Sequence, residues 1–396
     1  MQSQLSTWNP PSPKLEGHPT GVYSWFTYTP GFSSSFAKSA IREFVGEERR
    51  DELVADIWNG AGTTTAAAHH LGVSAVGLEL NPALVIVARA KSVTRRQLLN
   101  GSRRALDIAS RRLRRKSIPR SLRDWLGIDA GAPLPRMHCP SHALSALLLL
   151  NTSRACYQET RPGFRCPGDR VRAELQRQID LVESSAELLP ARRSADCRVL
   201  TGDARKAGQI RDNTISLLLS SPPYCTRIDY GRLTGFEQDF LGVSERRNAR
   251  ALREQLMGTT ALRTEGNWRA EGAKLRTPAV RRVLEKVRRH SSHRSEAYYY
   301  RNFLQYFCDA ELASATIARV LRPRGRALLV LQDSFYKEVH IPLSKLYIAM
   351  AESVGLKGSI VHSVPVLRTM AARNPGTRKY RQGAVYSEDV VLLERS

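Results

Sequence analysis

The sequence predicts an α/β fold with a mostly parallel central sheet, on three observations. Short apolar runs alternate with stretches of helical pattern along much of the 396-residue chain. A glycine-rich turn directly follows the first of these runs, as happens where a buried strand leads into a helix. Asn81 and Pro82 follow the second run and are typical of a helix start. In such a sheet, the loops at the carboxyl ends of the strands carry the ligand site.

The predicted elements follow one another in a regular order. A strand at residues 53–58 leads through the glycine turn into an Ala-rich helix at 63–71, and a strand at 73–80 leads into a helix at 82–90. Further strands are predicted at 197–200, 214–220 and 327–332. The apolar runs at 359–366 and 385–393 predict a closing antiparallel pair, which brings the sheet to seven strands.

Two long segments, residues 91–195 and 246–301, do not fit this alternation. A connection of this length inside a compact domain is usually functional or forms a subdomain. Both segments are basic, and the first opens with a helical pattern. A single charge run is more often a solvated helix face, but two such runs beside one sheet favour a nucleic-acid surface. The candidate contacts are Arg111, Arg112, Arg288 and Arg289.

The charge of the whole chain also indicates a polyanionic partner. The formal net charge is +24, which favours nucleic acid first and an anionic membrane surface second, with a general solubility bias as the alternative. Six cysteines spread over the chain indicate a reducing compartment and give no zinc-binding spacing, so we expect no metal. No apolar run reaches the roughly 20 residues of a membrane span, and the first residues do not resemble a signal peptide. We therefore expect a cytoplasmic, nucleoid-associated protein without membrane contact.

The glycine turn predicts a nucleotide-like ligand. Asp56 ends the first strand, and Gly60 and Gly62 allow the backbone to turn tightly and approach a ligand at the start of the next helix. Glu79 ends the second strand, where an acidic side chain can accept ribose hydroxyls. The same arrangement occurs in dinucleotide sites, but Thr65 stands where their third glycine would be expected.

The motif Ser221-Pro222-Pro223-Tyr224 directly follows an apolar strand and resembles a motif of enzymes that act on the exocyclic amine of a base. The alternative is an ordinary strand-ending turn. The lone pair of an exocyclic amine is delocalised into the ring, so an enzyme must draw it back with acceptors at the amine hydrogens. The Ser221 hydroxyl and the Pro222 carbonyl are such acceptors, and Tyr224 offers a flat face to a base extruded from the duplex. The motif therefore predicts group transfer by positioning and aimed dipoles.

Together, these motifs resemble the Ser-Pro-Pro-Tyr class of DNA amino-methyltransferases. The shared pattern is Asp-x-x-x-Gly-x-Gly-Thr-Thr, then Gly-x-Glu-x-Asn-Pro, then Ser-Pro-Pro-Tyr, with Ile57 and Trp58 where the family usually has Pro and Phe. The resemblance implies a Rossmann-like, seven-stranded methyltransferase sheet and S-adenosylmethionine as cofactor. It places Glu79 at the ribose, Asp203 at the adenine amine, and Asp56, Gly60 and Gly62 at the methionine end. The full set of cofactor residues it implies is Phe36, Asp56, Asn59, Gly60, Gly62, Thr63, Thr64, Glu79, Asp203 and Ser220.

The resemblance also implies a substrate. In that family Ser-Pro-Pro-Tyr tends to accompany methylation of cytosine N4, and motifs that begin with Asp or Asn tend to accompany adenine N6. We therefore expect site-specific methylation of double-stranded DNA at cytosine N4. The alternatives are an adenine-N6 enzyme, an RNA base methyltransferase, and a catalytically silent DNA-binding partner. A restriction or defence-system partner would fit such an enzyme.

The resemblance divides the chain into five parts. Residues 20–90 would be the cofactor-binding half, 91–195 a basic helical insertion that contacts DNA, 196–245 the catalytic part, 246–301 a target-recognition segment, and 302–396 the last strands. Within the catalytic part, Arg227 would touch a phosphate or pair with Asp229 to order the loop over the base.

Overall fold

The computed structural model describes most of the chain. The described residues are 8–14, 19–45, 52–113, 119–129, 137–159, 167–191, 195–225, 228–242, 246–263, 268–366, 380 and 386–396. Within them, no helix has the length and hydropathy that a membrane crossing requires.

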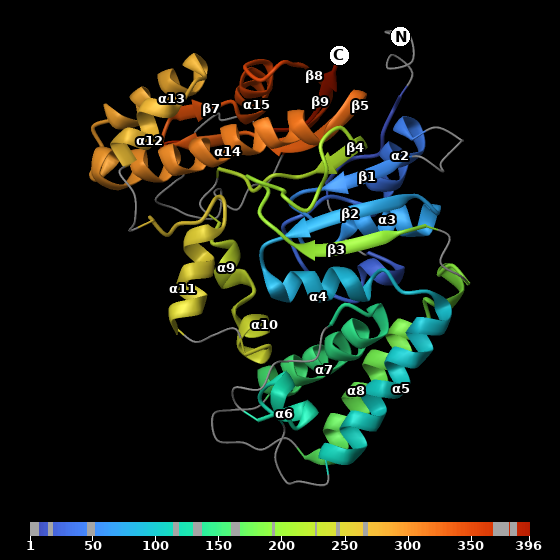
Figure 1. Ribbon diagram of the computed structural model, residues 1–396. Helices are drawn as coiled ribbons and strands as arrows, with labels where there is room; N and C mark the ends of the chain where they lie inside the picture. Colours follow the sequence, from blue (N-terminus) through green and yellow to red (C-terminus); the bar gives the residue numbers. More distant parts are fainter. Residues whose placement is uncertain are drawn as a thin grey trace.

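A seven-stranded sheet forms the centre of the molecule (Figure 1), so the predicted α/β fold is confirmed. Its spatial order is β3-β2-β1-β4-β5-β9-β8. The first five strands in this order run parallel, and β9 is antiparallel to both β5 and β8. The strands are β1 (Leu53–Asp56), β2 (Ser74–Glu79), β3 (Cys197–Thr201), β4 (Ile215–Ser220), β5 (Leu321–Gln332), β8 (Leu356–Pro365) and β9 (Ser387–Arg395).

Alternating side chains of the strands bury the two faces of the sheet under different helices. On β5, Leu328 and Val330 pack in one core with α2 (Ser34–Phe44) and α3 (Thr63–Leu71). Leu329 and Leu331 pack on the opposite face with α14 (Arg301–Val320) and α15 (Leu343–Glu352). Helices therefore cover both faces, and the carboxyl ends of β1 to β4 remain at one edge for a ligand site.

In chain order, a helical subdomain follows α4 (Pro82–Ala90) and precedes β3, and in space it packs on the side of α4 that faces away from the sheet (Figure 1). Capping boxes start two of its helices, with Thr94 paired to Gln97 and Ser121 paired to Asp124. Its central helix carries a run of buried leucines, because it packs against α4 and the other three α-helices of the subdomain. The elements are α5 (Arg95–Arg112), α6 (Leu122–Leu126), the central α7 (Pro140–Glu159), α8 (Gly168–Glu183) and η3 (Ala186–Leu188).

The subdomain closes at its base. The backbone N–H of Arg95, at the start of α5, donates to the carbonyl of Pro190 at 3.1 Å. The guanidinium of Arg95 also donates to the Ala186 carbonyl. The two chain segments that enter and leave the subdomain are therefore held together near β2 and β3, which are neighbours in the sheet.

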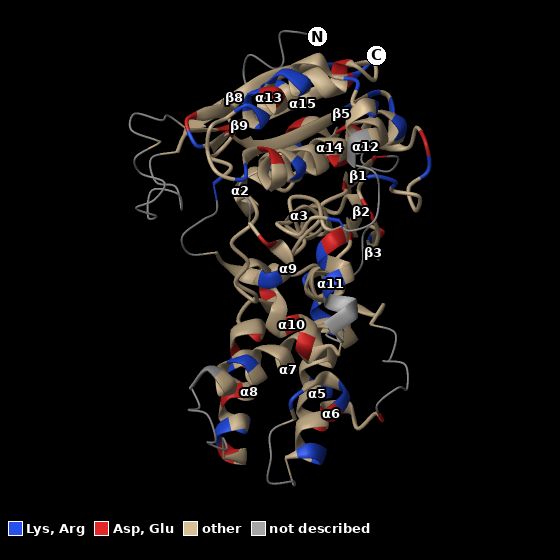
Figure 2. Cartoon of the chain, turned by 90° about the vertical axis from the view of Figure 1, so that its left-hand side faces the viewer, with Lys and Arg blue, Asp and Glu red and all other residues tan. Residues whose placement is uncertain are grey.

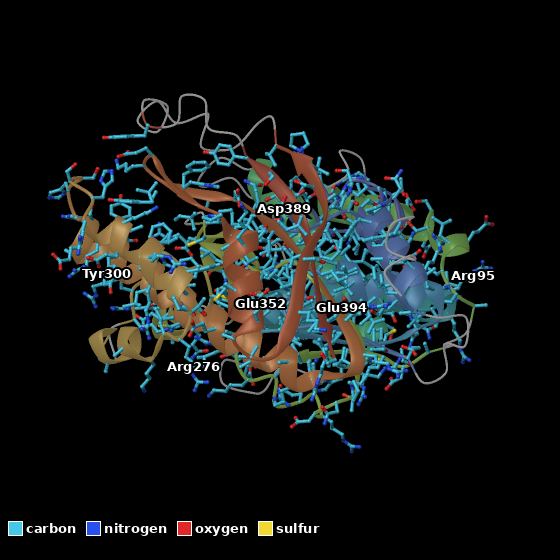
Figure 3. All side chains as sticks on the ribbon, turned by 90° about the horizontal axis from the view of Figure 1, so that it is seen from above. Arg95, Arg276, Tyr300, Glu352, Asp389 and Glu394 are labelled. Atoms are coloured by element: carbon cyan, nitrogen blue, oxygen red, sulfur yellow. The ribbon has the colours of Figure 1, made fainter. Side chains whose placement is uncertain are left out.

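Residues 268–301 of the second basic segment lie at the other end of the molecule, whereas its first helix, residues 246–255, lies beside residues 230–233 (Figure 1). Figure 3 labels Tyr300, at the end of this segment, and Arg95, at the start of the helical subdomain, on opposite sides of the sheet. A two-stranded hairpin, which the sequence did not predict, lies near the second segment. The elements here are α9 (Tyr230–Leu233), α10 (Gly235–Phe240), α11 (Arg246–Gln255), α12 (Trp268–Lys274), α13 (Pro278–Arg288), η4 (Ser295–Tyr300), β6 (Ser334–Tyr336) and β7 (Val339–Ile341); η1 (Gly21–Tyr23) lies near the N-terminus.

Candidate active site

One cavity of about 1240 Å³ opens at the carboxyl ends of the parallel strands. Gly60 of the glycine turn and Glu79 at the end of β2 line one part of it. Ser221 to Tyr224, after β4, line another part, and Asp203 after β3 also contributes. The structure therefore brings both predicted motifs, which are separated by more than 140 residues, to a single site.

Left-handed backbone at two glycines forms the turn after β1. Gly60 has φ +49° and Gly62 has φ +85°, a region that residues with a Cβ rarely adopt. A Cβ on Gly62 would lie 2.8 Å from the Cα of Ala88, so the start of α3 packs directly against α4. The turn thus needs glycine at position 62 for both conformation and space.

Glu79 is held by the backbone on both of its carboxylate oxygens. The N–H of Gly60 donates to Oε2 at 2.8 Å, and the N–H of Asn81 donates to Oε1 at 2.8 Å. Burial nevertheless raises the pKa of Glu79 to about 7, although these hydrogen bonds favour the charged form. Near neutral pH, Glu79 is therefore poised between its two protonation states at the wall of the cavity.

Asp56, Thr64 and Ser220 do not line the cavity but fasten three elements together beneath it. The Thr64 hydroxyl donates to Oδ2 of Asp56 at 2.6 Å, and the Ser220 hydroxyl donates to Oδ1. The Trp58 N–H donates to the same carboxylate. Burial raises the pKa of Asp56 to about 6, with the hydroxyl contacts acting in the opposite direction. These three residues link β1, α3 and β4 and thereby set the shape of the turn.

Four further predicted cofactor residues, Phe36, Asn59, Gly62 and Thr63, also lie outside the cavity lining. Phe36 is fully buried in the core of α2, with its ring centroid 5.9 Å from that of Phe32, so the structure gives it a packing role. Asn59 is buried, and its side chain accepts a hydrogen bond from Thr65. Thr63 is the first residue of α3 and is half-buried.

Arg205, which the sequence analysis did not single out, forms an ion pair with the carboxylate of Asp203. Nε and Nη2 of Arg205 both donate to Asp203, at 2.6 to 3.0 Å, and Nη1 donates to Asp309 of α14 at 3.1 Å. Asp309 also receives the guanidinium of Arg263. Burial opposes the shift, but the hydrogen bonds from Arg205 lower the pKa of Asp203. Asp203 is therefore ionised and already shared when a ligand arrives.

Hydrogen bonds from three other elements orient the Ser-Pro-Pro-Tyr motif. The Ser221 hydroxyl donates to the Val330 carbonyl of β5 at 3.2 Å. The Tyr224 N–H donates to the Tyr230 hydroxyl at 3.0 Å, and the Tyr306 hydroxyl donates to the Pro223 carbonyl at 2.8 Å. The loop is thus fixed by β5, α9 and α14, although nothing in the local sequence identifies these partners.

Glu388 of β9 is a further cavity residue that the sequence analysis missed. Its Oε1 accepts a hydrogen bond from the Tyr224 hydroxyl at 3.0 Å. Its Oε2 is buried and has no hydrogen-bond partner among the residues that the structure describes. Burial raises the pKa of Glu388, which favours a neutral carboxyl beside the motif. No motif surrounds Glu388, so only the pairing of β9 with β5 could have pointed to it.

Many aromatic side chains line the cavity. Tyr299 and Tyr336 lie with ring centroids 4.9 Å apart, and Phe335 lies equally close to Tyr386. Such faces are suited to stacking with nucleobases. The aromatic lining residues beyond Tyr224 and Tyr230 include Tyr299, Phe303, Phe335, Tyr336, Tyr380 and Tyr386.

The predicted nucleic-acid contacts lie in different surroundings. Arg111 is exposed at the end of α5, whereas Nε of Arg112 donates to the Trp125 carbonyl and has a local structural role. Arg288 and Arg289 are exposed, and both pair with Glu285. Arg227 lies outside the described residues, and the ion-pair partner of Asp229 within them is chiefly Arg253 of α11, with a longer contact from Arg232.

Comparison with known proteins adds relatives at low identity. No family model matches the chain. It is 25% identical over 300 residues to the type II methyltransferase M.BsoBI of Geobacillus stearothermophilus, a match that covers 60% of this chain and 56% of that relative. It is 21% identical over 418 residues to the type II methyltransferase M.AvaI of Nostoc sp., covering 92% of this chain and 85% of that relative.

Among solved structures, the chain is similar to geranyl diphosphate methyltransferase in complex with SAM, with 10% identity and a TM-score of 0.35, over 92% of this chain and 85% of that one.

Proposed function

We propose that the chain is a DNA methyltransferase that transfers a methyl group from S-adenosylmethionine to the exocyclic amine of cytosine in double-stranded DNA. The observation that carries this proposal is the single cavity shared by Glu79, Gly60 and the motif from Ser221 to Tyr224. A nucleoside site and a set of amine acceptors in one cavity are what such a reaction needs. The two relatives named as type II methyltransferases support the proposal.

The residues of the cavity fit the proposed cofactor. A carboxylate oxygen accepts more than one hydrogen bond, so Glu79 can accept two ribose hydroxyls while it keeps the N–H groups of Gly60 and Asn81. Asp203 would accept from the adenine amine in addition to Arg205. When bound, S-adenosylmethionine supplies the methyl group on a positively charged sulfur.

The motif residues would prepare the amine. The Ser221 hydroxyl and the Pro222 carbonyl accept the amine hydrogens, which returns the lone pair to nitrogen. Tyr306 already occupies the neighbouring carbonyl of Pro223, so the Pro222 carbonyl is the one offered to the base. The Tyr224 ring stacks on the base, and its hydroxyl is held by Glu388. These groups act by position, which concentrates the catalytic effect in the fixed geometry of the loop.

We assign cytosine N4 because the motif begins with serine, and adenine N6 is the second candidate. Phosphate contacts would come from the exposed arginines Arg111, Arg288 and Arg289, and we also propose Arg227, which lies outside the described residues. Figure 2 shows Lys and Arg, together with Asp and Glu, on α5, α8 and α11; of these helices, α11 lies on the side to which the carboxyl ends of the strands point in Figure 1. Binding by such contacts falls steeply with salt concentration. A partner nuclease in a restriction system fits the same proposal.

The test is transfer of tritium from labelled S-adenosylmethionine to unmethylated genomic DNA, followed by digestion to nucleosides and mass spectrometry. We expect N4-methylcytosine with the wild type and, at equal reaction time, about 10- to 100-fold less of it with Tyr224→Ala. Label in N6-methyladenine would overturn the choice of base and keep the reaction. Label in RNA alone would identify an RNA methyltransferase. Cofactor binding without transfer to either nucleic acid would identify a silent binding protein.

A further inference from the structure

Leu233 is an exposed leucine at the rim of the cavity. It is the last residue of α9, it retains 50% of its accessible surface, and it lines the cavity. The side chain of Arg232 beside it is 76% exposed. A single exposed leucine needs no explanation by itself, so its importance depends on how the structure holds it.

A clamp on its outer side holds α9 in place. Asp229 caps the helix by accepting from the Arg232 N–H at 3.1 Å. The same carboxylate accepts hydrogen bonds from Nε and Nη2 of Arg253 of α11 and from the Thr260 hydroxyl. The contact is close: a Cβ on Gly231 would lie 2.5 Å from Cγ of Arg253. The turn that carries Leu233 is therefore pressed against α11.

Buried polar groups hold α9 from the inner side. Thr234, 1% exposed, accepts from Nδ2 of Asn81 at 2.7 Å, which ties the turn to the helix cap after β2. Gln238 donates to the Gly231 carbonyl at 2.7 Å. Tyr230, at the start of α9, accepts the N–H of Tyr224. One rigid turn thus positions the exposed leucine relative to both the proposed cofactor side and the catalytic motif.

We propose that Leu233 inserts into the DNA duplex and fills the space that the target base leaves when it enters the cavity. This inference rests on the proposed function. Extruding a base breaks its stacking, and apolar side chains placed between base steps compensate for that loss in other DNA-binding proteins. Arg232, next to the leucine and exposed, is placed to contact the adjacent phosphate. A rigid mount suits this role, because a mobile side chain would not hold the gap open.

The experiment compares Leu233→Ala with Leu312→Ala on two substrates. Leu312 of α14 is a matched control, because it is 54% exposed and is not part of the cavity lining. One substrate is a duplex with the mapped target base paired normally, and the other has an abasic site opposite that base, so that extrusion is easier. We expect Leu233→Ala to lose about 10- to 100-fold in single-turnover rate on the paired duplex. On the second substrate it should recover to within about threefold of the wild type.

A second readout does not depend on turnover. With 2-aminopurine at the target position, extrusion raises fluorescence, and Leu233→Ala should give less of this signal than the wild type or Leu312→Ala. Leu233→Met keeps an apolar wedge and should restore both the signal and the rate. Thermal unfolding of the two alanine variants should match, since both positions are exposed.

Two results would overturn the inference while the proposed function stands. One is wild-type rate and fluorescence for Leu233→Ala on the paired duplex. The other is an equal loss on both substrates, which would indicate damage to the cavity. Absence of methyl transfer by the wild type would refute the proposed function, and this inference with it, before any variant is compared.

Discussion

The Tyr224 hydroxyl donates a hydrogen bond to Oε1 of Glu388 at 3.0 Å and so joins the loop after β4 to the strand β9. The two residues are 164 positions apart in sequence. Oε2 of Glu388 has no hydrogen-bond partner among the described residues, so the Tyr224 hydroxyl is the side-chain donor that this buried carboxyl has there. The orientation of the Tyr224 ring and the protonation state of Glu388 are therefore linked.

We predict that Tyr224→Phe and Tyr224→Ala will separate the two roles of this tyrosine. Phenylalanine keeps the stacking face, so the methyl-transfer rate should fall less than about tenfold. Alanine removes the face, which is worth about 1–3 kcal/mol per base, so the loss should be about 10- to 100-fold. Single-turnover rates measure both. Equal losses in the two variants would assign the effect to the hydroxyl and would contradict the stacking role.

Cofactor affinity should depend on pH through Glu79. Ribose hydroxyls need a carboxylate as acceptor, and the pKa of Glu79 is raised to about 7 in the folded protein. The ionised fraction increases with pH, so the dissociation constant of S-adenosylmethionine should be about tenfold larger at pH 6 than at pH 8. Titration calorimetry in buffers of different ionisation enthalpy measures the affinity and the proton released. Glu79→Gln should bind weakly at both pH values; the same pH dependence in this variant would place the titrating group elsewhere.

Arg205→Met should destabilise the fold, because Arg263 is then the remaining ion-pair partner of the buried Asp309 carboxylate among the described residues. Breaking a buried pair costs about 3 kcal/mol or more, and the side chains of Arg205 and Asp309 are 14% and 2% exposed. Urea unfolding measures the loss. Arg177→Met is the control, since Arg177 makes an exposed pair with Glu174 within one helix. A loss as small as that of the control would show that the cluster contributes little to stability.

Gly62→Ala should destabilise the fold by at least about 1–2 kcal/mol. The backbone is left-handed at φ +85°, and the new methyl group would collide with Ala88. Gly208→Ala is the matched control, since a Cβ there meets no atom within 4 Å. Thermal or urea unfolding compares the two. If Gly62→Ala unfolds like Gly208→Ala, the turn is more adaptable than its geometry indicates.

The sequence predicted those parts of the molecule that local patterns encode. Apolar runs of strand length predicted the seven strands, and the cap Asn81 with Pro82 as first helical residue predicted the start of α4. The two motifs were placed at strand ends, which is enough to bring them to one edge of a parallel sheet. Contacts over long sequence distance were not predictable, because side chains such as Glu388 and Arg205 acquire their roles only from strand order and helix packing.

The structure also gives different positions to acidic residues that the sequence pattern could not distinguish. Asp56 and Glu79 both end strands, but Asp56 lies beneath the turn and Glu79 lines the cavity. Phe36 shows the same limit, since an aromatic residue near a site can equally belong to the core. The hairpin of β6 and β7 is three residues per strand, too short for a pattern of period two to be distinctive.

The closed base of the helical subdomain has a consequence for how this protein can diversify. Because the N–H of Arg95 meets the Pro190 carbonyl, the two ends of the segment stay adjacent whatever lies between them. The entropic cost of closing a loop grows only slowly with its length. Residues between Arg95 and Pro190 can therefore be gained or lost with little effect on the stability of the sheet. Proteins related to this one can therefore carry insertions of very different length at this position while they keep the same sheet and the same proposed reaction.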